Sequence, residues 1–130
     1  MSTGLTLDCG ALIAIERHDR RATALVESMR RRGGRVTVPT AVVVEWWRGQ
    51  RGPIARLLDA FDIESLDAEL ARLAGQALAL VPAGPSAVDA VVVASAARRG
   101  DAVLTGALED LEALSAVFPG VRILSLAKMA

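Results

Sequence analysis

Short hydrophobic runs alternate along this chain with longer stretches in which apolar residues recur every three or four positions. The runs are typical of strands and the longer stretches of amphipathic helices. The expected strands are 5–7, 35–38, 61–65, 102–105 and 121–126, and the expected helices are 11–17, 19–32, 41–49, 53–60, 67–78, 90–97 and 107–117. Regular alternation of strands and helices predicts a three-layer α/β/α sandwich with a central five-stranded parallel sheet. Residues 1–130 are expected to form a single domain.

Several polar residues stand where helices are expected to begin. Asp19, Thr40 and Asp67 each precede a helical pattern and are predicted to start it. Ser86 with Asp89 three residues later is the capping-box pattern, with Asp in place of the longer Glu or Gln. Such residues are explained by helix structure alone, so a second role requires separate evidence.

Composition narrows the possible chemistry. One cysteine and one histidine, His18, exclude an internal disulfide, a cysteine-rich zinc site and a two-histidine mechanism. No basic segment followed by a long apolar run opens the chain, and no apolar run approaches the ~18 residues of a membrane span. A cytoplasmic protein without a membrane segment is therefore expected. Its 52% hydrophobic content reflects either a surface covered by a second chain or a composition rich in Ala and Val.

Charge is unevenly distributed although the net charge is zero. Residues 17–56 contain ten Arg against three acidic residues, whereas residues 57–130 contain ten acidic residues against five basic ones. This asymmetry permits a basic surface for nucleic acid beside an acidic cluster. Solvated helix faces would produce the same counts.

Acidic residues follow the predicted strands at equivalent places. Asp8 ends the first strand, Glu45 lies in the helix after the second, Asp89 starts a helix, and Asp110 comes shortly after the fourth strand. Because the carboxyl ends of parallel strands share one edge of a sheet, these carboxylates are predicted to meet there. Glu45 follows three valines, so it is expected to be paired, protonated or bound to a cation. Clustered carboxylates favour Mg²⁺ or Mn²⁺, and hydrolysis of a phosphodiester is the natural chemistry of such a centre.

Four motifs in this order resemble those of PIN-domain ribonucleases, in particular the VapC-type toxins of bacterial toxin–antitoxin systems. They are Leu7-Asp8, the segment from Pro39 to Gly49 with Glu45 in it, Ser86-x2-Asp89-Ala90, and Leu104-Thr105-Gly106-x3-Asp110-Leu111. The resemblance covers essentially the whole chain. It implies a Mg²⁺- or Mn²⁺-dependent endoribonuclease with an RNA substrate, a homodimer, and a cognate antitoxin that blocks the acidic groove. It also implies that Asp8 and Asp89 are the principal metal ligands, that Glu45 is a further one, and that Asp110 holds a metal-bound water.

The chain departs from the family pattern at two positions. Ala107 stands where an acidic residue is usual, and Cys9 stands where a hydroxyl residue is common. These departures keep open an alternative, a weakened PIN domain that binds antitoxin or RNA without efficient cleavage. A response-regulator receiver domain is a second alternative of similar size. Arg48, close after Glu45, is a candidate for a phosphate contact, and a surface salt bridge would explain it equally well.

Overall fold

A parallel five-stranded sheet forms the centre of the molecule. The computed structural model describes residues 3–49 and 52–128, and in this part of the chain the strand order is β3-β2-β1-β4-β5, with every neighbouring pair parallel. In chain order the elements are β1 (Gly4–Leu7), α1 (Cys9–Glu16), α2 (Arg20–Arg31), β2 (Arg35–Pro39), α3 (Thr40–Trp47), η1 (Gly52–Ala60), β3 (Asp62–Glu64), α4 (Ala68–Leu80), α5 (Ala87–Arg99), β4 (Ala102–Thr105), α6 (Leu108–Ser115), β5 (Ile123–Ser125) and η2 (Leu126–Lys128). The predicted three-layer sandwich is confirmed.

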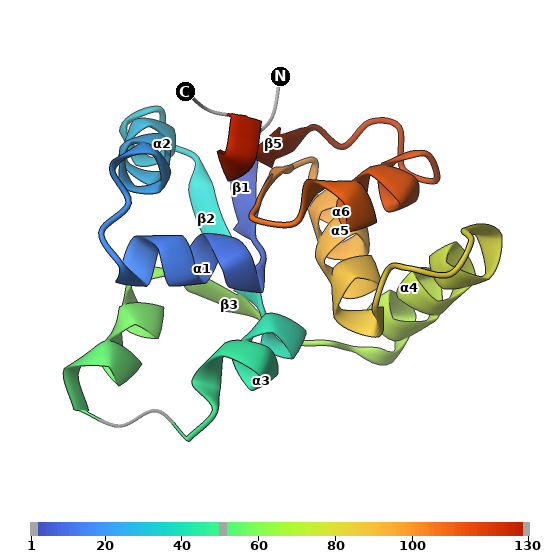
Figure 1. Ribbon diagram of the computed structural model, residues 1–130, viewed down its shortest axis with the longest axis horizontal. Coiled ribbons are helices and arrows are strands. Elements are labelled where there is room, and N and C mark those ends of the chain that lie inside the picture. Colours follow the sequence, from blue (N-terminus) through green and yellow to red (C-terminus); the bar gives the residue numbers. More distant parts are fainter. Residues whose placement is uncertain (1–2, 50–51, 129–130) are drawn as a thin grey trace.

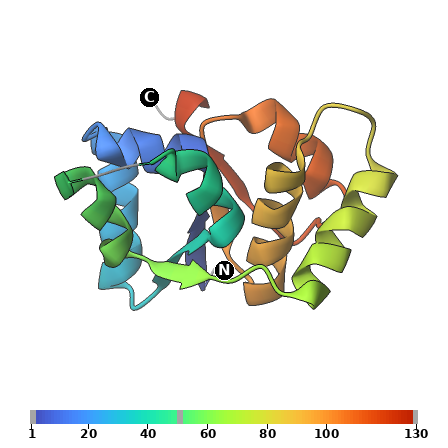
Figure 2. The ribbon, with the colours of Figure 1, turned by 90° about the horizontal axis from the view of Figure 1, so that it is seen from below.

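Helices cover both faces of the sheet. Helices α1 and α2 lie on one side of it, and α4, α5 and α6 lie on the other (Figure 1). The view from below shows α3 between these two helical layers, where it contacts both α1 and α5 (Figure 2). Helix α5 contacts β1, β2 and β4, and its core positions are filled by small apolar side chains such as Ala90, Val93 and Ala94. This close packing explains why α5 is apolar on nearly every side.

The strand order also separates the two fold classes that the sequence left open. From β1 the chain moves outward through β2 and β3, then crosses back to β4 on the opposite side of β1. The order therefore reverses between β1 and β4, which makes this junction the topological switch point of the sheet. Receiver domains have the order 2-1-3-4-5. The structure excludes that alternative.

Most of the predicted helix starts are observed. The Asp19 carboxylate accepts hydrogen bonds from the amides of Arg21 and Ala22, and the Asp67 carboxylate accepts one from Leu70. Helix α3 begins at Thr40 as predicted, but the prediction that the Thr40 side chain caps the helix is wrong. Pro39 precedes α3 without a side-chain cap, and the Thr40 hydroxyl instead accepts a hydrogen bond from the amide of Leu66, 3.1 Å away.

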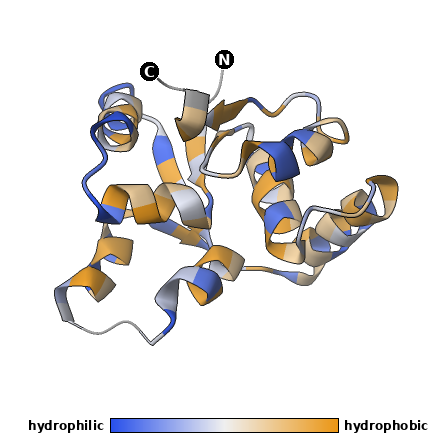
Figure 3. Cartoon of the chain, in the orientation of Figure 1, coloured by the Kyte–Doolittle hydropathy of each residue, from blue (hydrophilic) through white to orange (hydrophobic). Residues whose placement is uncertain are grey.

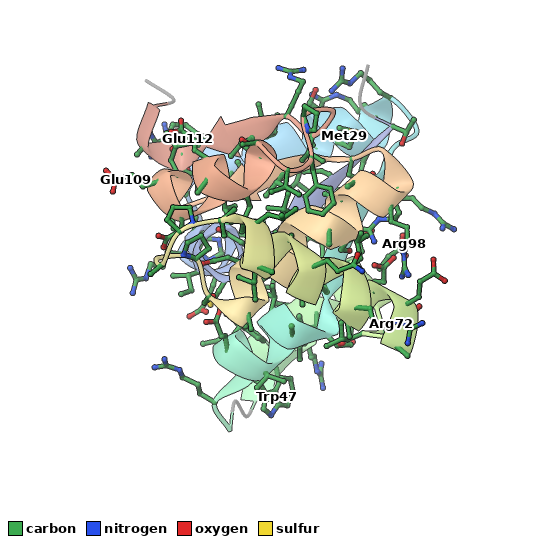
Figure 4. The ribbon with its side chains drawn as sticks, turned by 90° about the vertical axis from the view of Figure 1, so that its right-hand side faces the viewer. Met29, Trp47, Arg72, Arg98, Glu109 and Glu112 are labelled. Carbon is green, nitrogen blue, oxygen red and sulfur yellow. The ribbon has the colours of Figure 1, made fainter. Side chains whose placement is uncertain are left out.

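The surface combines strongly hydrophilic stretches with a few exposed apolar side chains. The stretch before α2 and the end of that helix are the most hydrophilic (blue in Figure 3), in keeping with their arginines. Val44 and Trp47, three residues apart on α3, are 77% and 38% exposed, whereas Trp46 is buried. Figure 4 shows Trp47 at the outer end of α3. Within the described residues, no helix has the length and apolar character needed to cross a membrane.

A buried polar network ties the C-terminal end of α5 to the sheet. The Arg99 guanidinium forms ion pairs with Glu64 and Asp101, and it donates hydrogen bonds to the hydroxyls of Thr6 and Ser95 at 2.6 and 2.7 Å. Thr6 in turn donates to Asp101 at 2.8 Å. Thr6, Ser95 and Asp101 are all buried, so the network satisfies polar groups that would otherwise be costly inside the protein.

Candidate metal and phosphodiester site

Asp8 and Thr105 face each other across the switch point. Asp8 directly follows β1 and Thr105 ends β4, the neighbouring strand. The Thr105 hydroxyl donates a hydrogen bond to Asp8 Oδ2, and the amide of Ala107 donates one to the same hydroxyl oxygen at 2.7 Å. The other carboxylate oxygen, Oδ1, accepts from the amide of Ala11 at 2.8 Å and so caps α1. Both oxygens of Asp8 are thereby held in fixed positions.

The environment of Asp8 disfavours its charge. Burial raises the pKa of Asp8, and the negative charge of Asp89 raises it further. The Thr105 hydroxyl and the amides of Ala11 and Gly106 lower it, but they do not compensate fully, so the net pKa shift is upward. A cation beside Asp8 would favour the ionised form of this carboxylate.

Close backbone contact fixes the two walls of the switch point. A Cβ atom on Gly10 would lie 3.0 Å from the Cα of Gly106, and one on Gly106 would lie 3.2 Å from the Cα of Gly10. The first turn of α1 therefore packs directly on the loop after β4. A side chain at either position would force the two backbones apart by a few tenths of an ångström, so glycine favours this approach at both.

Asp89 contributes both to helix structure and to the electrostatics of the site. Its carboxylate accepts a hydrogen bond from the amide of Ser86 at 2.9 Å, while the Ser86 hydroxyl accepts one from the amide of Asp89 at 3.1 Å. The predicted capping box is confirmed. At the same time Asp89 lies close enough to Asp8 for its charge to raise the pKa of that residue. Asp89 can therefore cap α5 and act electrostatically on Asp8 at the same time.

Glu45 lies in a cleft next to Asp8, but it is not buried. The cleft has a volume of about 420 Å³ and runs between α1 and α3; its lining residues are Cys9, Ile13, Glu16, Arg17, Glu45, Trp46 and Arg48. The Glu45 side chain is exposed, so the expectation that its apolar neighbours in the sequence force pairing or protonation is wrong. The valines before it turn to other sides of the helix. Burial raises the pKa of the Cys9 thiol, and the charges of Glu45 and Asp8 add to this effect, which keeps the thiol protonated.

Asp110 and Ala107 lie on the other side of the switch point. Asp110 is half-buried in the first turn of α6, whereas Glu109 and Glu112 of the same helix project outward (Figure 4). Ala107 precedes this helix without a side-chain cap. Its amide supports Thr105, but it offers no carboxylate at the position where the family pattern has one.

The residues present fit only one kind of metal coordination. The described part of the chain contains no group of three or more His, Cys, Asp or Glu side chains placed to hold a metal ion. Asp8, Glu45 and Asp89 thus do not form a preassembled three-carboxylate centre. Mg²⁺ retains several water ligands and is commonly held by one or two carboxylates together with substrate phosphates. The Asp8–Asp89 pair, with oxygen donors and a raised pKa at Asp8, suits that mode.

The fold and the acidic switch point define a class, the PIN-like α/β/α sandwich. Solved structures support this assignment at the level of the fold. VapBC2 from Rickettsia felis bound to a promoter DNA fragment matches with a TM-score of 0.70 at 12% identity, over 93% of this chain and 97% of that chain. DNA-bound VapBC from Salmonella typhimurium matches with a TM-score of 0.67 at 21% identity, over 96% of this chain and 98% of that chain. FitAcB from Neisseria gonorrhoeae matches with a TM-score of 0.69 at 18% identity, over 96% of this chain and 99% of that chain. No protein-family model matches the sequence, and a search of curated proteins finds no match.

Some features of the site carry no clear signal in the sequence. The hydrogen bond from Thr105 to Asp8 joins residues 97 positions apart, and the contact between Gly10 and Gly106 depends on the pairing of β1 with β4. Arg17 lines the cleft although in the sequence it only follows the end of a short, apolar helix. Only the strand order makes these residues neighbours.

Proposed function

We propose that this chain is a divalent-metal-dependent endoribonuclease and the toxin of a type II toxin–antitoxin pair. The observation that supports this most directly is the buried Asp8 carboxylate at the switch point, hydrogen-bonded by Thr105 and facing the charge of Asp89. Its structural neighbours include VapBC and FitAB complexes, which adds weight to the toxin assignment.

Each predicted site residue has a role that its position allows. Asp8 and Asp89 would hold Mg²⁺ or Mn²⁺, and Glu45 would reach it through water from the cleft. When bound, the cation supplies activation of a water molecule and neutralises charge on the phosphate oxygens. Thr105 orients the Asp8 carboxylate, and Asp110 would orient water from α6. RNA is the proposed substrate.

The test is cleavage of a structured RNA with Mg²⁺, with Mn²⁺ and with EDTA. Wild-type protein is expected to cleave only with a metal, and Asp8→Asn is expected to lose at least a hundredfold in rate. Asp59→Asn is the matched control, because Asp59 is an exposed carboxylate on η1, outside the cleft and the switch point. Isothermal titration with Mn²⁺ should show binding to wild type and to Asp59→Asn but not to Asp8→Asn. Cleavage that persists in Asp8→Asn would refute the proposal.

A second candidate function is a PIN-like domain that binds RNA or antitoxin without efficient cleavage. Ala107 favours it, because the loop after β4 lacks a carboxylate there. Substitution Ala107→Asp distinguishes the two. If the missing acid limits catalysis, Ala107→Asp raises both Mn²⁺ affinity and cleavage rate. If the wild type already cleaves and the substitution changes nothing, the weakened-domain alternative is wrong.

We also propose a cognate antitoxin and a homodimer as partners. Val44 and Trp47 lie three residues apart on α3 and so share one side of the helix. These two apolar side chains are 77% and 38% exposed, and a second copy of the chain would cover them. Light scattering on wild type and on Val44→Glu measures this: a dimer that becomes a monomer supports the assignment, and a monomeric wild type refutes it.

A further inference from the structure

The cleft beside Asp8 contains two arginines that have no ion-pair partner in the described part of the chain. Arg17 follows the last turn of α1, and Arg48 follows the last turn of α3, so they lie on opposite walls. Neither forms an ion pair within the described residues; the only side-chain hydrogen bond of Arg48 runs from Nε to the carbonyl of Glu45 at 3.2 Å. A surface salt bridge therefore does not explain Arg48.

The acidic residues of the cleft are engaged otherwise. Glu16 Oε1 accepts a hydrogen bond from the buried Trp46 indole at 2.9 Å, which holds α1 against α3 and forms the floor of the cleft. Glu45 lies next to Cys9, toward Asp8. The cleft therefore contains two carboxylates and two guanidinium groups, and the two arginines stand at the C-terminal ends of α1 and α3.

We propose that Arg17 and Arg48 form a clamp for the backbone phosphates of a single RNA strand lying in this cleft. Arg17 lies nine positions after Asp8, across the eight residues of α1 and about 13 Å along its axis, so Arg17 contacts a different phosphate from the one at Asp8. Arginine binds phosphate through paired N–H donors, and two such groups on facing walls fix the path of a strand's backbone through the cleft. The clamp rests on the proposed function in that RNA is taken to enter the acidic site.

The conformation of Arg48 supports a role beyond structure. Its φ of 42° places it in the left-handed region, which is adopted mainly by glycine at helix ends. A side chain held in this region incurs a steric cost and is often found at functional positions. Gly49, with φ of 72°, follows it, so the chain turns sharply just after the arginine.

The clamp is tested by binding, separately from cleavage. Fluorescence anisotropy with a labelled single-stranded RNA is measured in EDTA for wild type, Arg17→Gln, Arg48→Gln and the double variant. Arg122→Gln is the matched control, because Arg122 is an exposed arginine just before β5, at the opposite edge of the sheet. Each clamp substitution is expected to weaken binding about tenfold. Each should also reduce the slope of log K against log salt by about 0.7, as for one lost phosphate contact on a single strand.

A charge-conserving variant, thermal melts and kinetics with Mn²⁺ separate loss of the phosphate contact from loss of folding. Arg48→Lys keeps the positive charge and is expected to recover part of the affinity, while thermal melts verify that the variants fold. With Mn²⁺ present, KM should rise in the clamp variants with little change in kcat. Wild-type RNA binding with the expected loss in both arginine variants supports the clamp even if no cleavage is detected. Clamp variants that bind like wild type, an equal loss in Arg122→Gln, or no RNA binding by wild type would overturn it, even if cleavage depends on Asp8.

Discussion

Substitution of Thr105 by valine tests whether the hydrogen bond across the switch point stabilises the fold. Valine has nearly the same shape, so the change removes the hydroxyl from a fully buried side chain without leaving a cavity. Two hydrogen bonds disappear, one donated to the Asp8 carboxylate and one accepted from the amide of Ala107. A hydrogen bond to a charged group is worth about 1.5–3 kcal/mol, and the Ala107 amide can turn to water because Ala107 is exposed. The free energy of unfolding should therefore fall by about 2–3 kcal/mol at pH 7.5.

Urea unfolding in EDTA measures this loss, and Thr105→Ser is the matched variant. Serine keeps both hydrogen bonds and loses one buried methyl group, which costs about 1 kcal/mol. Because the Thr105 hydroxyl lowers the pKa of Asp8, its contribution is greatest when Asp8 is ionised. The difference between Thr105→Val and wild type should shrink as the pH falls and Asp8 becomes protonated. A valine variant as stable as wild type, or less harmful than serine, would show that this bond does not hold the two strands as argued.

The remaining predictions concern the polar network, the titrating carboxylates and two glycines. Arg99→Met should lower the free energy of unfolding by about 3 kcal/mol, because the buried Asp101 carboxylate keeps its hydrogen bond from Thr6 but loses its basic partner. Arg98→Met, which breaks more exposed ion pairs, should cost less than 1 kcal/mol in the same urea titration. Burial opposes the ionisation of Glu64, but hydrogen bonds from Ser95 and Arg99 outweigh it and lower the pKa of Glu64. The ionised carboxylate therefore stabilises the fold above about pH 4.5, and this contribution is lost as the pH falls below that value. Glu64→Gln should flatten the dependence of the free energy of unfolding on pH in that range. The pH dependence that Asp8 contributes has the opposite sign, because its raised pKa makes the folded state lose stability as the pH rises above 3.8. Metal-free Asp8→Asn should therefore melt at a higher temperature than wild type at pH 7. An unchanged or lower melting temperature would contradict the burial argument. Gly10→Ala should destabilise the protein by about 1–3 kcal/mol through its contact with Gly106. Gly75→Ala should stabilise it by about 0.5–1 kcal/mol, because Gly75 lies in α4 and its added Cβ would meet no atom from outside its own turn of helix within 4 Å. Calorimetry that shows the same sign for both variants would count against the close packing of Gly10 on Gly106.

Local signals in the sequence were sufficient for the elements but not for their spatial order. The caps at Asp19, Asp67 and Ser86 involve hydrogen bonds over two or three residues, so residue type and spacing predict them directly. Alternation of strands and helices likewise predicts a parallel sheet, since each strand needs a helical crossover. The order β3-β2-β1-β4-β5 depends on which strands pack best across long chain separations, and no local pattern encodes that.

Where the sequence misled, tertiary contacts replaced the local preference. Thr40 follows a proline at a helix start, but its hydroxyl binds the Leu66 amide after β3. Glu45 follows three valines, yet helical geometry turns it to the solvent side of α3. Asp101 stands just before β4 with no local signal in the sequence, yet its side chain joins a buried network with Thr6, 95 residues away.

The two buried polar clusters of the sheet, one around Arg99 and one around Asp8, differ in how fully their charges are compensated. On the α5 face, Arg98 and Arg99 pair with Glu64, and Arg99 also pairs with Asp101, so each of these carboxylates has a basic partner. At the switch point, Asp8 is buried with hydrogen-bond donors but no basic partner, and Asp89 adds a second negative charge. Proteins that depart from local consistency in this manner usually do so at functional sites. The uncompensated charge at Asp8 lies beside two arginines that form no ion pair within the described residues. This combination is what the proposed site for a cation and a phosphate backbone requires.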